Sequence, residues 1–155
     1  MKTIIRIAVC GIFLLAAALV TSTIVAHKSS ASAASAPAPK DTDIQRGKYL
    51  VEEVAKCGEC HTPRDDQGQL EPNRWLQGAP IWITPVHADP HWAERAPALA
   101  GFPGYSDDDG FNILEKGIGA NGETIRPPMH IYHMKHEDAV AIIAYLRSLP
   151  NIAPK

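Results

Sequence analysis

Residues 57–61 read Cys-Gly-Glu-Cys-His, and this short run limits the possible folds more than any other part of the sequence. Cys57 and Cys60 stand three positions apart, so their thiols can add across the two vinyl groups of one haem. His61 follows directly, and its imidazole can reach the haem iron from the same face. The motif therefore predicts a domain that holds one covalent haem c through Cys57, Cys60 and His61, with His61 as an iron ligand.

Three other kinds of site use two neighbouring cysteines, and the surrounding sequence disfavours each of them. A thioredoxin-type dithiol would lie in a βαβ pattern and follow an aromatic residue, whereas Lys56 precedes Cys57. A zinc site needs two further ligands, yet the sequence beyond residue 40 offers no other cysteine and only scattered histidines. A disulfide of this spacing closes a very small loop and stabilises little. Covalent haem remains the best interpretation of the motif.

The N-terminus is predicted to be an export element. Lys2 and Arg6 precede an uncharged run over residues 7–26, and the positive-inside rule keeps them in the cytoplasm while the remainder crosses the membrane. The 20 residues of this run match a membrane-spanning helix and favour an uncleaved anchor, although cleavage at the small-residue sites 31–33 or 34–36 stays open. We expect the domain on the periplasmic side of the bacterial inner membrane, either anchored or soluble after cleavage.

A low-complexity stretch of Ser, Ala and Pro follows over residues 29–40. Such a composition cannot bury an apolar face, so this stretch is predicted to be a flexible tether. Cys10 lies early in the apolar run and follows Val9, so it is interpreted as an apolar residue rather than a lipidation site. The chain is thus divided into a signal peptide or anchor over residues 1–28, a linker over 29–40 and a folded domain over 41–155.

The charge of this domain excludes one class of partner and favours another. Beyond Lys40 the sequence has eleven Lys and Arg against seventeen Asp and Glu, a net charge of −6. An acidic domain of this kind is not expected to bind nucleic acid. It favours a redox partner with a basic docking face. The remaining 115 residues have room for one core, which a large apolar cofactor would help to stabilise.

Capping signals and apolar periodicity predict three helices, and no segment alternates cleanly enough to predict a sheet, so the fold class is all-α. The first helix is expected from Ile44 to Ala55, with Thr42 or Asp43 as its cap. The second is expected over residues 107–116, because Ser106 and Asp109 can form a capping box at its start and Gly117 can end it. The third is expected over residues 136–148 and has the clearest apolar face.

A long stretch between Arg64 and Arg95 has no convincing periodicity. Loops of this length inside a compact domain tend to be functional or to pack on something. The stretch contains all three tryptophans, Trp75, Trp82 and Trp92, which more often form a packed satellite cluster than a binding surface. We therefore expect them to be packed.

Met129 is the candidate for the sixth ligand of the iron. Pro127 and Pro128 hold the backbone before it in an extended conformation, which would let the thioether project at the haem face opposite His61. Methionine paired with histidine raises the reduction potential of haem. The expected metal ligands are therefore His61 and Met129.

Other side chains near Met129 stay open as alternatives. Met134 is a second thioether, but its place just before the last helix is typical of a residue that packs on the helix start. His130, His133 and His136 could also reach an iron, although a histidine with no further signal is more often a surface residue.

From about Arg46 to Pro150 the sequence resembles the class I cytochrome c family. Residues 46–50 are similar to the N-terminal helix of that family, whose glycine, here Gly47, allows a close crossing with the C-terminal helix around one covalent haem. Residues 97–101 resemble a Pro-x-Leu-x-Gly segment whose proline carbonyl accepts the Nδ1 hydrogen of the proximal histidine, a role that the resemblance implies for Pro97. The end of the chain is similar to small bacterial cytochromes and to haem subunits of membrane dehydrogenases.

This resemblance implies one-electron transfer between redox proteins or membrane dehydrogenase and oxidase complexes, without catalysis by the chain itself. Two alternatives stay open, a dedicated haem subunit of a membrane dehydrogenase and a haem enzyme or gas sensor with an open sixth position. The sequence departs from the family pattern at two places. His61 and Pro97 lie 36 residues apart, far more than in compact members, and Lys135 stands where relatives usually have Ser or Thr as a helix cap.

Overall fold

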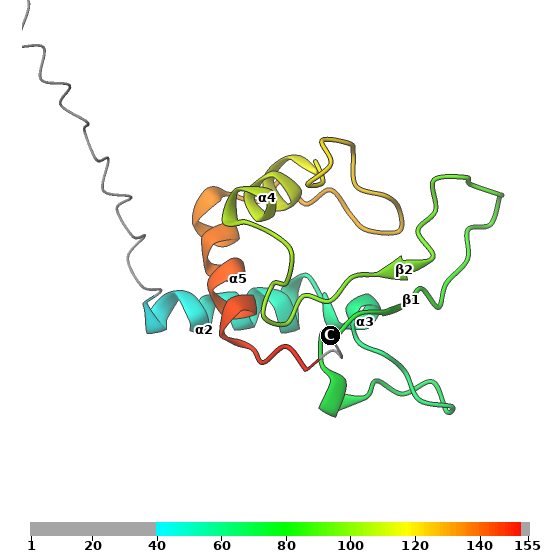
Figure 1. The fold of residues 1–155 in the computed structure, drawn as a ribbon, viewed down its shortest axis with the longest axis horizontal. Coiled ribbons are helices and arrows are strands. Elements are labelled where there is room, and N and C mark those ends of the chain that lie inside the picture. Colours follow the sequence, from blue (N-terminus) through cyan, green and yellow to red (C-terminus); the bar gives the residue numbers. More distant parts are fainter. Residues whose placement is uncertain (1–39, 153–155) are drawn as a thin grey trace, which may run out of the picture. The chain divides into compact units, whose positions relative to one another are not determined.

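The computed structural model describes residues 40–152, and this part of the chain is mainly helical (Figure 1). The predictions for the leader and for most of the linker concern residues outside this range. In chain order the elements are α2 (Asp41–Tyr49), η1 (Leu50–Val54), α3 (Gly58–His61), η2 (Pro72–Arg74), β1 (Ala79–Pro80), β2 (Arg95–Ala96), α4 (Asp107–Phe111), η3 (Asn112–Lys116) and α5 (His136–Ser148). The predicted helical character is confirmed, while the two-residue strands β1 and β2 were not expected.

The first helix begins earlier than its sequence suggests. Its N-cap is Lys40, which is extended and makes no hydrogen bond through its side chain, so the predicted cap at Thr42 or Asp43 is wrong. Asp41 and Asp43 instead lie inside the first turn, where their charge interacts favourably with the positive end of the helix dipole. After Tyr49 the helix widens into the π-helical turn η1, in which Ala55 N–H donates to Leu50 O at 2.8 Å.

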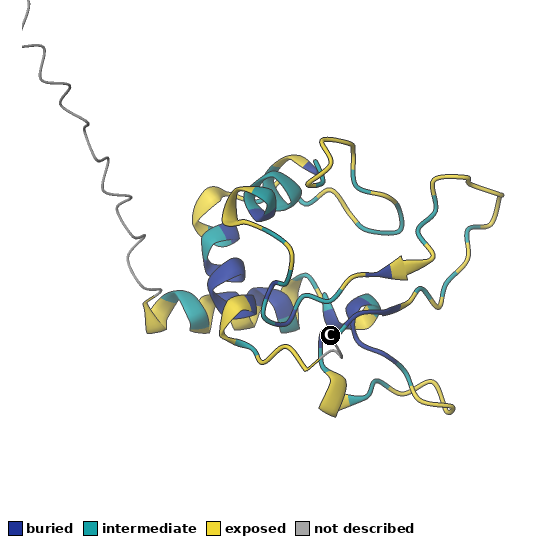
Figure 2. Cartoon of the chain, in the orientation of Figure 1, coloured by how far each residue is buried: buried dark blue, intermediate teal, exposed yellow. Residues whose placement is uncertain are grey.

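Helices α2 and α5 approach each other closely at Gly47. A Cβ built on Gly47 would lie 1.9 Å from the carbonyl oxygen of Ala141 and 2.7 Å from Cβ of Tyr145, so only glycine fits at this contact. An ion pair between Arg46 and Asp138 joins the same two helices at the surface. The core gathers along this contact, as the dark blue face of α5 shows in Figure 2. Its members in α5 are Ala141, Ile142, Ile143, Tyr145 and Leu146, joined from η1 by Leu50 and Val51.

The ends of the other two predicted helices are confirmed. Ser106 caps α4, its hydroxyl accepting from Asp109 N–H while the Asp109 carboxylate accepts from Ser106 N–H, and η3 continues α4 as far as Lys116. Gly117 ends the helix with φ of 70°, a left-handed conformation that glycine adopts at little cost. Helix α5 has the predicted bounds, and its N-cap, Lys135, makes no hydrogen bond through its side chain.

The long stretch before Pro97 folds back on itself as a hairpin that projects away from the helices (Figure 1). Strands β1 and β2 pair antiparallel, with Ala79 opposite Ala96, and close the stem of this hairpin over residues 79–96. The expected tryptophan packing holds for Trp75, which lies against the core, and is wrong for Trp82, which is 58% exposed. Trp82 is held at the surface instead, where its ring lies 4.6 Å from the Arg64 guanidinium.

Candidate functional site

The Cys-x-x-Cys-His motif forms one helical turn, α3. Cys57 is its N-cap, His61 N–H donates to Cys57 O at 3.0 Å, and Thr62 N–H donates to Gly58 O at 3.1 Å. Residues three and four apart share a face of a helix, so the side chains of Cys57, Cys60 and His61 lie on the same side of this turn. The sequence predicted the three residues as a site, whereas the helical turn that groups them was not foreseen.

His61 is buried, with 7% of its surface exposed, and both its backbone and its ring are fixed. Its Nδ1 lies 2.8 Å from the carbonyl oxygen of Pro97, the contact that the resemblance implies. Gly78 N–H donates to His61 O at 2.8 Å on the other side. Burial lowers the pKa of His61, and the Pro97 carbonyl opposes this shift. A neutral imidazole that donates Nδ1–H to Pro97 leaves Nε2 with its lone pair free for a metal.

Both thiols of the turn are free. Burial raises the pKa of Cys57 to about 11, and burial also raises the pKa of Cys60, with Glu59 adding to the rise. A thioredoxin-type dithiol needs the opposite, a lowered pKa that supplies a reactive thiolate. Two free, mostly protonated thiols beside an oriented imidazole suit the donor set of a covalently attached haem.

Trp75 packs directly behind the motif turn. A Cβ built on Gly58 would lie 2.1 Å from the Trp75 ring, so the indole occupies the space that any side chain at position 58 would need. Thr62, which is 1% exposed, accepts a hydrogen bond from Leu76 N–H at 3.0 Å through its hydroxyl. Because Thr62 follows His61 and Leu76 follows Trp75, this bond holds Trp75 beside the motif. The long stretch between the motif and Pro97, which we call the insertion, therefore supports the motif turn on the Gly58 side.

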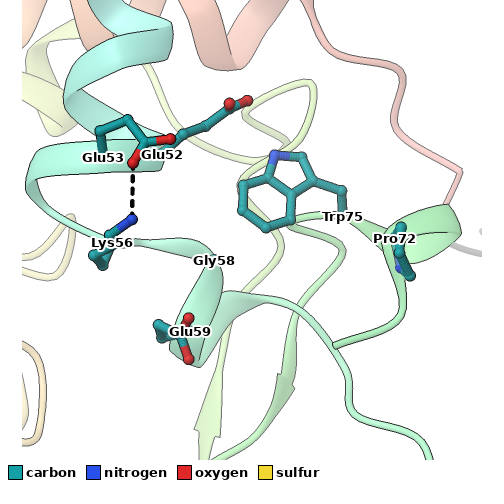
Figure 3. A pocket seen from close by; sticks show the side chains of 7 residues that line it. All are labelled: Glu52, Glu53, Lys56, Gly58, Glu59, Pro72 and Trp75. Carbon is teal, nitrogen blue, oxygen red and sulfur yellow. Dashed lines mark hydrogen bonds and ion pairs between the residues drawn. The ribbon is translucent and has the colours of Figure 1, made fainter. Parts of the chain in front are cut away.

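The same side of the turn carries an open, mostly acidic pocket (Figure 3). Three carboxylates and one ammonium group surround it, and Lys56 Nζ lies 3.0 Å from Glu53 Oε2. The lining residues are Glu52, Glu53, Lys56, Gly58, Glu59, Pro72 and Trp75. This surface, next to Gly58 and Trp75, therefore carries a net negative charge.

Met129 is half-buried and lies on a loop, residues 126–135, that passes close to the motif. Tyr132 Oη donates to Ala55 O at 3.3 Å, just before the motif turn. Burial raises the pKa of Tyr132 to about 12, and the nearby thiols of Cys57 and Cys60 add to the rise. The structure thus brings the loop beside the cysteines, while ligation by Met129 stays a prediction. The Tyr132 contact could not have been found from spacing, because 77 residues separate its partners.

Two of the alternative ligands make other contacts in the structure, and the other two are exposed. Met134 packs against the core and its N–H donates to Leu114 O at 3.1 Å, which confirms the packing interpretation. His136 Nδ1 lies 2.8 Å from Glu115 Oε1, and its ring packs edge-on against Phe111. His130 and His133 are exposed.

Two features are absent from residues 40–152. None of the helices within residues 40–152 has the length and apolar character needed to cross a bilayer. In the same part of the chain, no group of three or more His, Cys, Asp or Glu side chains is placed to hold a metal ion.

Comparison with known proteins gives one family match and several relatives. Residues 44–150 match the family described as Cytochrome c. The chain is 38% identical over 117 residues to the fructose dehydrogenase cytochrome subunit of Gluconobacter japonicus, covering 70% of this chain and 22% of that protein. It is 35% identical over 116 residues to a diheme cytochrome c-type protein of Cereibacter sphaeroides, covering 70% of this chain and 36% of that protein.

A third relative is, like the first, a cytochrome subunit of a dehydrogenase. The chain is 32% identical over 136 residues to the cytochrome c subunit of a quinone-dependent alcohol dehydrogenase from Gluconacetobacter polyoxogenes, covering 76% of this chain and 27% of that protein. The chain therefore spans between about a fifth and about a third of the length of these relatives.

Proposed function

The chain belongs to the cytochrome c family, and from this premise we propose that it is an electron carrier with one covalent haem c, ligated by His61 and Met129. The observation that carries the proposal is the motif turn, where two free thiols and an imidazole fixed by Pro97 lie on one face. A haem bound there would supply an iron that gains or loses one electron. A single haem is proposed because the sequence holds one Cys-x-x-Cys-His motif.

The chain's own residues divide the work of binding this cofactor. Cys57 and Cys60 would attach it, and His61 would coordinate the iron through Nε2 in the orientation set by Pro97. Met129 would coordinate from the loop that Tyr132 joins to Ala55. With both axial positions filled by protein, no position is left for a substrate, which favours electron transfer over catalysis.

The partner is proposed to be a membrane-associated redox complex. Two of the relatives named above are cytochrome subunits of dehydrogenases, which supports a dehydrogenase as electron donor. The net charge of −6 and the carboxylates beside the motif turn support a partner with a basic docking face. A shuttle and a dedicated subunit differ in whether the protein co-purifies with its donor from detergent extracts of the membrane.

The domain is proposed to work on the periplasmic side of the bacterial inner membrane. The support is the basic N-terminus followed by a bilayer-length apolar run and a Ser/Ala/Pro linker. The intact mass of the purified protein tests the proposed anchor. A mature chain that begins after Ala33, Ala36 or Ala38, in the soluble periplasmic fraction, would overturn it and leave export intact.

Replacing Met129 tests the proposed ligation. In Met129→Ala we expect the haem to stay covalently attached and the reduction potential to fall by on the order of 100 mV, because axial ligands set haem potentials over a range of about 0.8 V. The ferrous variant should also bind carbon monoxide, which the wild type should not. Redox titration and the visible spectrum measure these effects, and haem staining after denaturing electrophoresis checks attachment.

Met134→Ala is the matched control, since Met134 is a methionine of the same loop that packs against the core. It should leave the potential and carbon monoxide binding unchanged. If the wild type binds carbon monoxide as readily as Met129→Ala does, the sixth position is open and a haem enzyme or gas sensor becomes the better proposal.

A further inference from the structure

The hairpin over residues 79–96 is connected to both proposed iron ligands, to His61 through Pro97 and to Met129 through Arg126. Its second strand, β2, runs directly into Pro97, whose carbonyl oxygen orients His61. Ile81 N–H donates to Glu94 O at 2.9 Å and continues the pairing beyond the two strands. Within the hairpin, Trp92 Nε1–H donates to Ile83 O at 3.2 Å and holds the two arms together. The proximal side of the site is thus connected to a cross-braced hairpin.

The same hairpin is hydrogen-bonded to the start of the loop that carries Met129, residues 126–135. Arg126 Nε donates to His91 O at 2.9 Å, and its Nη2 donates to Trp92 O at 2.9 Å. Ala93 N–H donates to Pro127 O at 2.7 Å. Three hydrogen bonds therefore join three consecutive hairpin residues to the two residues that begin the loop. The two loop residues, Arg126 and Pro127, lie within three positions of Met129.

The loop is fastened separately at its other end. Tyr132 Oη donates to Ala55 O, and Met134 N–H donates to Leu114 O. Met129 thus lies between an anchor on the helical core and an anchor on the hairpin. Without the hairpin contacts the core anchor would remain, and Ile125 N–H would still donate to Gly117 O at 2.9 Å before Arg126. The segment from Arg126 to Ile131, which carries Met129, would then lose the contacts that hold it to the hairpin.

We propose that the hairpin is a clamp that keeps Met129 on the iron, with Arg126 as its positioning residue. This inference rests on the proposed ligation by Met129. Arginine suits the task because its planar guanidinium presents several donors in a fixed fork, so that two neighbouring carbonyl oxygens accept from one side chain. Lysine has a single ammonium group on a flexible stem and satisfies two carbonyls less well.

Displacement of Met129 by imidazole in the ferric holoprotein measures how well the clamp holds. An added ligand binds only when Met129 has left, so its apparent affinity rises with the fraction of molecules whose loop is open. We expect Arg126→Gln to bind imidazole about tenfold more tightly than the wild type, because two charge-assisted hydrogen bonds are lost. Arg126→Lys should give a smaller increase.

Arg147→Gln is the matched control. Arg147 is also exposed and also makes two hydrogen bonds, from Nε to Asp107 Oδ1 and from Nη2 to Tyr105 O, but it lies on α5 away from the loop. Its imidazole affinity should stay within about twofold of the wild type, since hydrogen bonds remote from the loop do not change the open fraction. An equal gain in Arg126→Gln and Arg147→Gln would overturn the clamp, because general destabilisation would then explain both.

The far-red absorbance band of methionine-ligated ferric haem separates this inference from the proposed function. If the wild type shows the band and Met129→Ala lacks it, the proposed ligation stands. Unchanged imidazole affinity in Arg126→Gln would then refute the clamp alone. If the wild type lacks the band, the ligation by Met129 fails and the clamp fails with it.

Discussion

The contact between α2 and α5 and the insertion that runs from Thr62 to Ala96 are held together by different means. At the helix contact, Gly47 brings two backbones together and most of the core residues of α5 are buried around it. In the insertion, Trp82 and Val86 are 58% and 94% exposed, and hydrogen bonds such as the one from Gly78 N–H to His61 O connect it to the rest of the domain. Apolar burial contributes most to folding stability, so the helix contact should set the stability and the insertion should mainly set positions.

Leu76 is the main exception within the insertion, next to Trp75, which also packs against the core. It is fully buried, its N–H donates to the Thr62 hydroxyl, and its carbonyl accepts from Leu99 and Ala100 N–H. Leu76 and its neighbour Trp75 thus attach the insertion to the core by apolar contact, and the comparison can be tested by graded substitutions in both regions.

Gly47→Val should have the largest effect. The added Cβ would overlap the Ala141 carbonyl, which is backbone and cannot rotate away, so α2 and α5 would have to separate. We expect a loss of unfolding free energy above the roughly 1–3 kcal/mol typical of overpacked cores. Guanidinium unfolding of the holoprotein, followed by far-UV circular dichroism, measures it. Gln45→Val on the exposed face of α2 is the control and should cost about 0.5 kcal/mol through helix propensity alone.

Leu76→Ala should have an intermediate effect of about 3 kcal/mol, because it leaves a cavity at a fully buried position. The same unfolding experiment applies. Leu70→Ala, at a half-buried position of the insertion, should cost only about 1 kcal/mol because less apolar surface is lost. Equal costs for the two variants would contradict the view that Leu76 is the main apolar attachment of the insertion.

Trp82→Ala should have the smallest effect, below about 1 kcal/mol, because an exposed cation–π contact and one exposed hydrogen bond contribute little. The side chain stacks on Arg64, and its Nε1–H donates to Glu59 O at 3.1 Å. Trp82→Phe keeps a ring for Arg64 and should recover part of the loss. A cost as large as that of Leu76→Ala would mean that the insertion is held by apolar packing after all.

The same division explains what could be predicted from the sequence. The start of α4, the end of η3 and both ends of α5 were predicted because a capping box, a terminal glycine and apolar periodicity are local signals. The start of α2 was placed wrongly because Lys40 caps it without a side-chain hydrogen bond. The fold of the insertion was out of reach, since its connections join residues far apart in the chain, as Arg126 and His91 show.

The candidate site divides in a similar way. Cys57, Cys60 and His61 follow one another in the sequence, so their chemistry could be predicted directly. Pro97 came from the family resemblance alone, and the structure supplies the hydrogen bond to His61. Trp75 against Gly58 and Tyr132 against Ala55 had no sequence signal, because each contact depends on how distant segments pack.

The two hydrogen bonds that fix His61 also make the segment between them adjustable in length. Gly78 N–H binds the carbonyl of His61, and Pro97 binds its ring, so the hairpin leaves and returns to the same residue. The pairing of Ala79 with Ala96 would still close the base of the hairpin if extra residues were inserted at its exposed tip, residues 84–90. The entropy of closing such a loop grows only slowly with its length. This tip is therefore a place where a peptide tag or a new binding segment can be grafted while the histidine keeps its orientation.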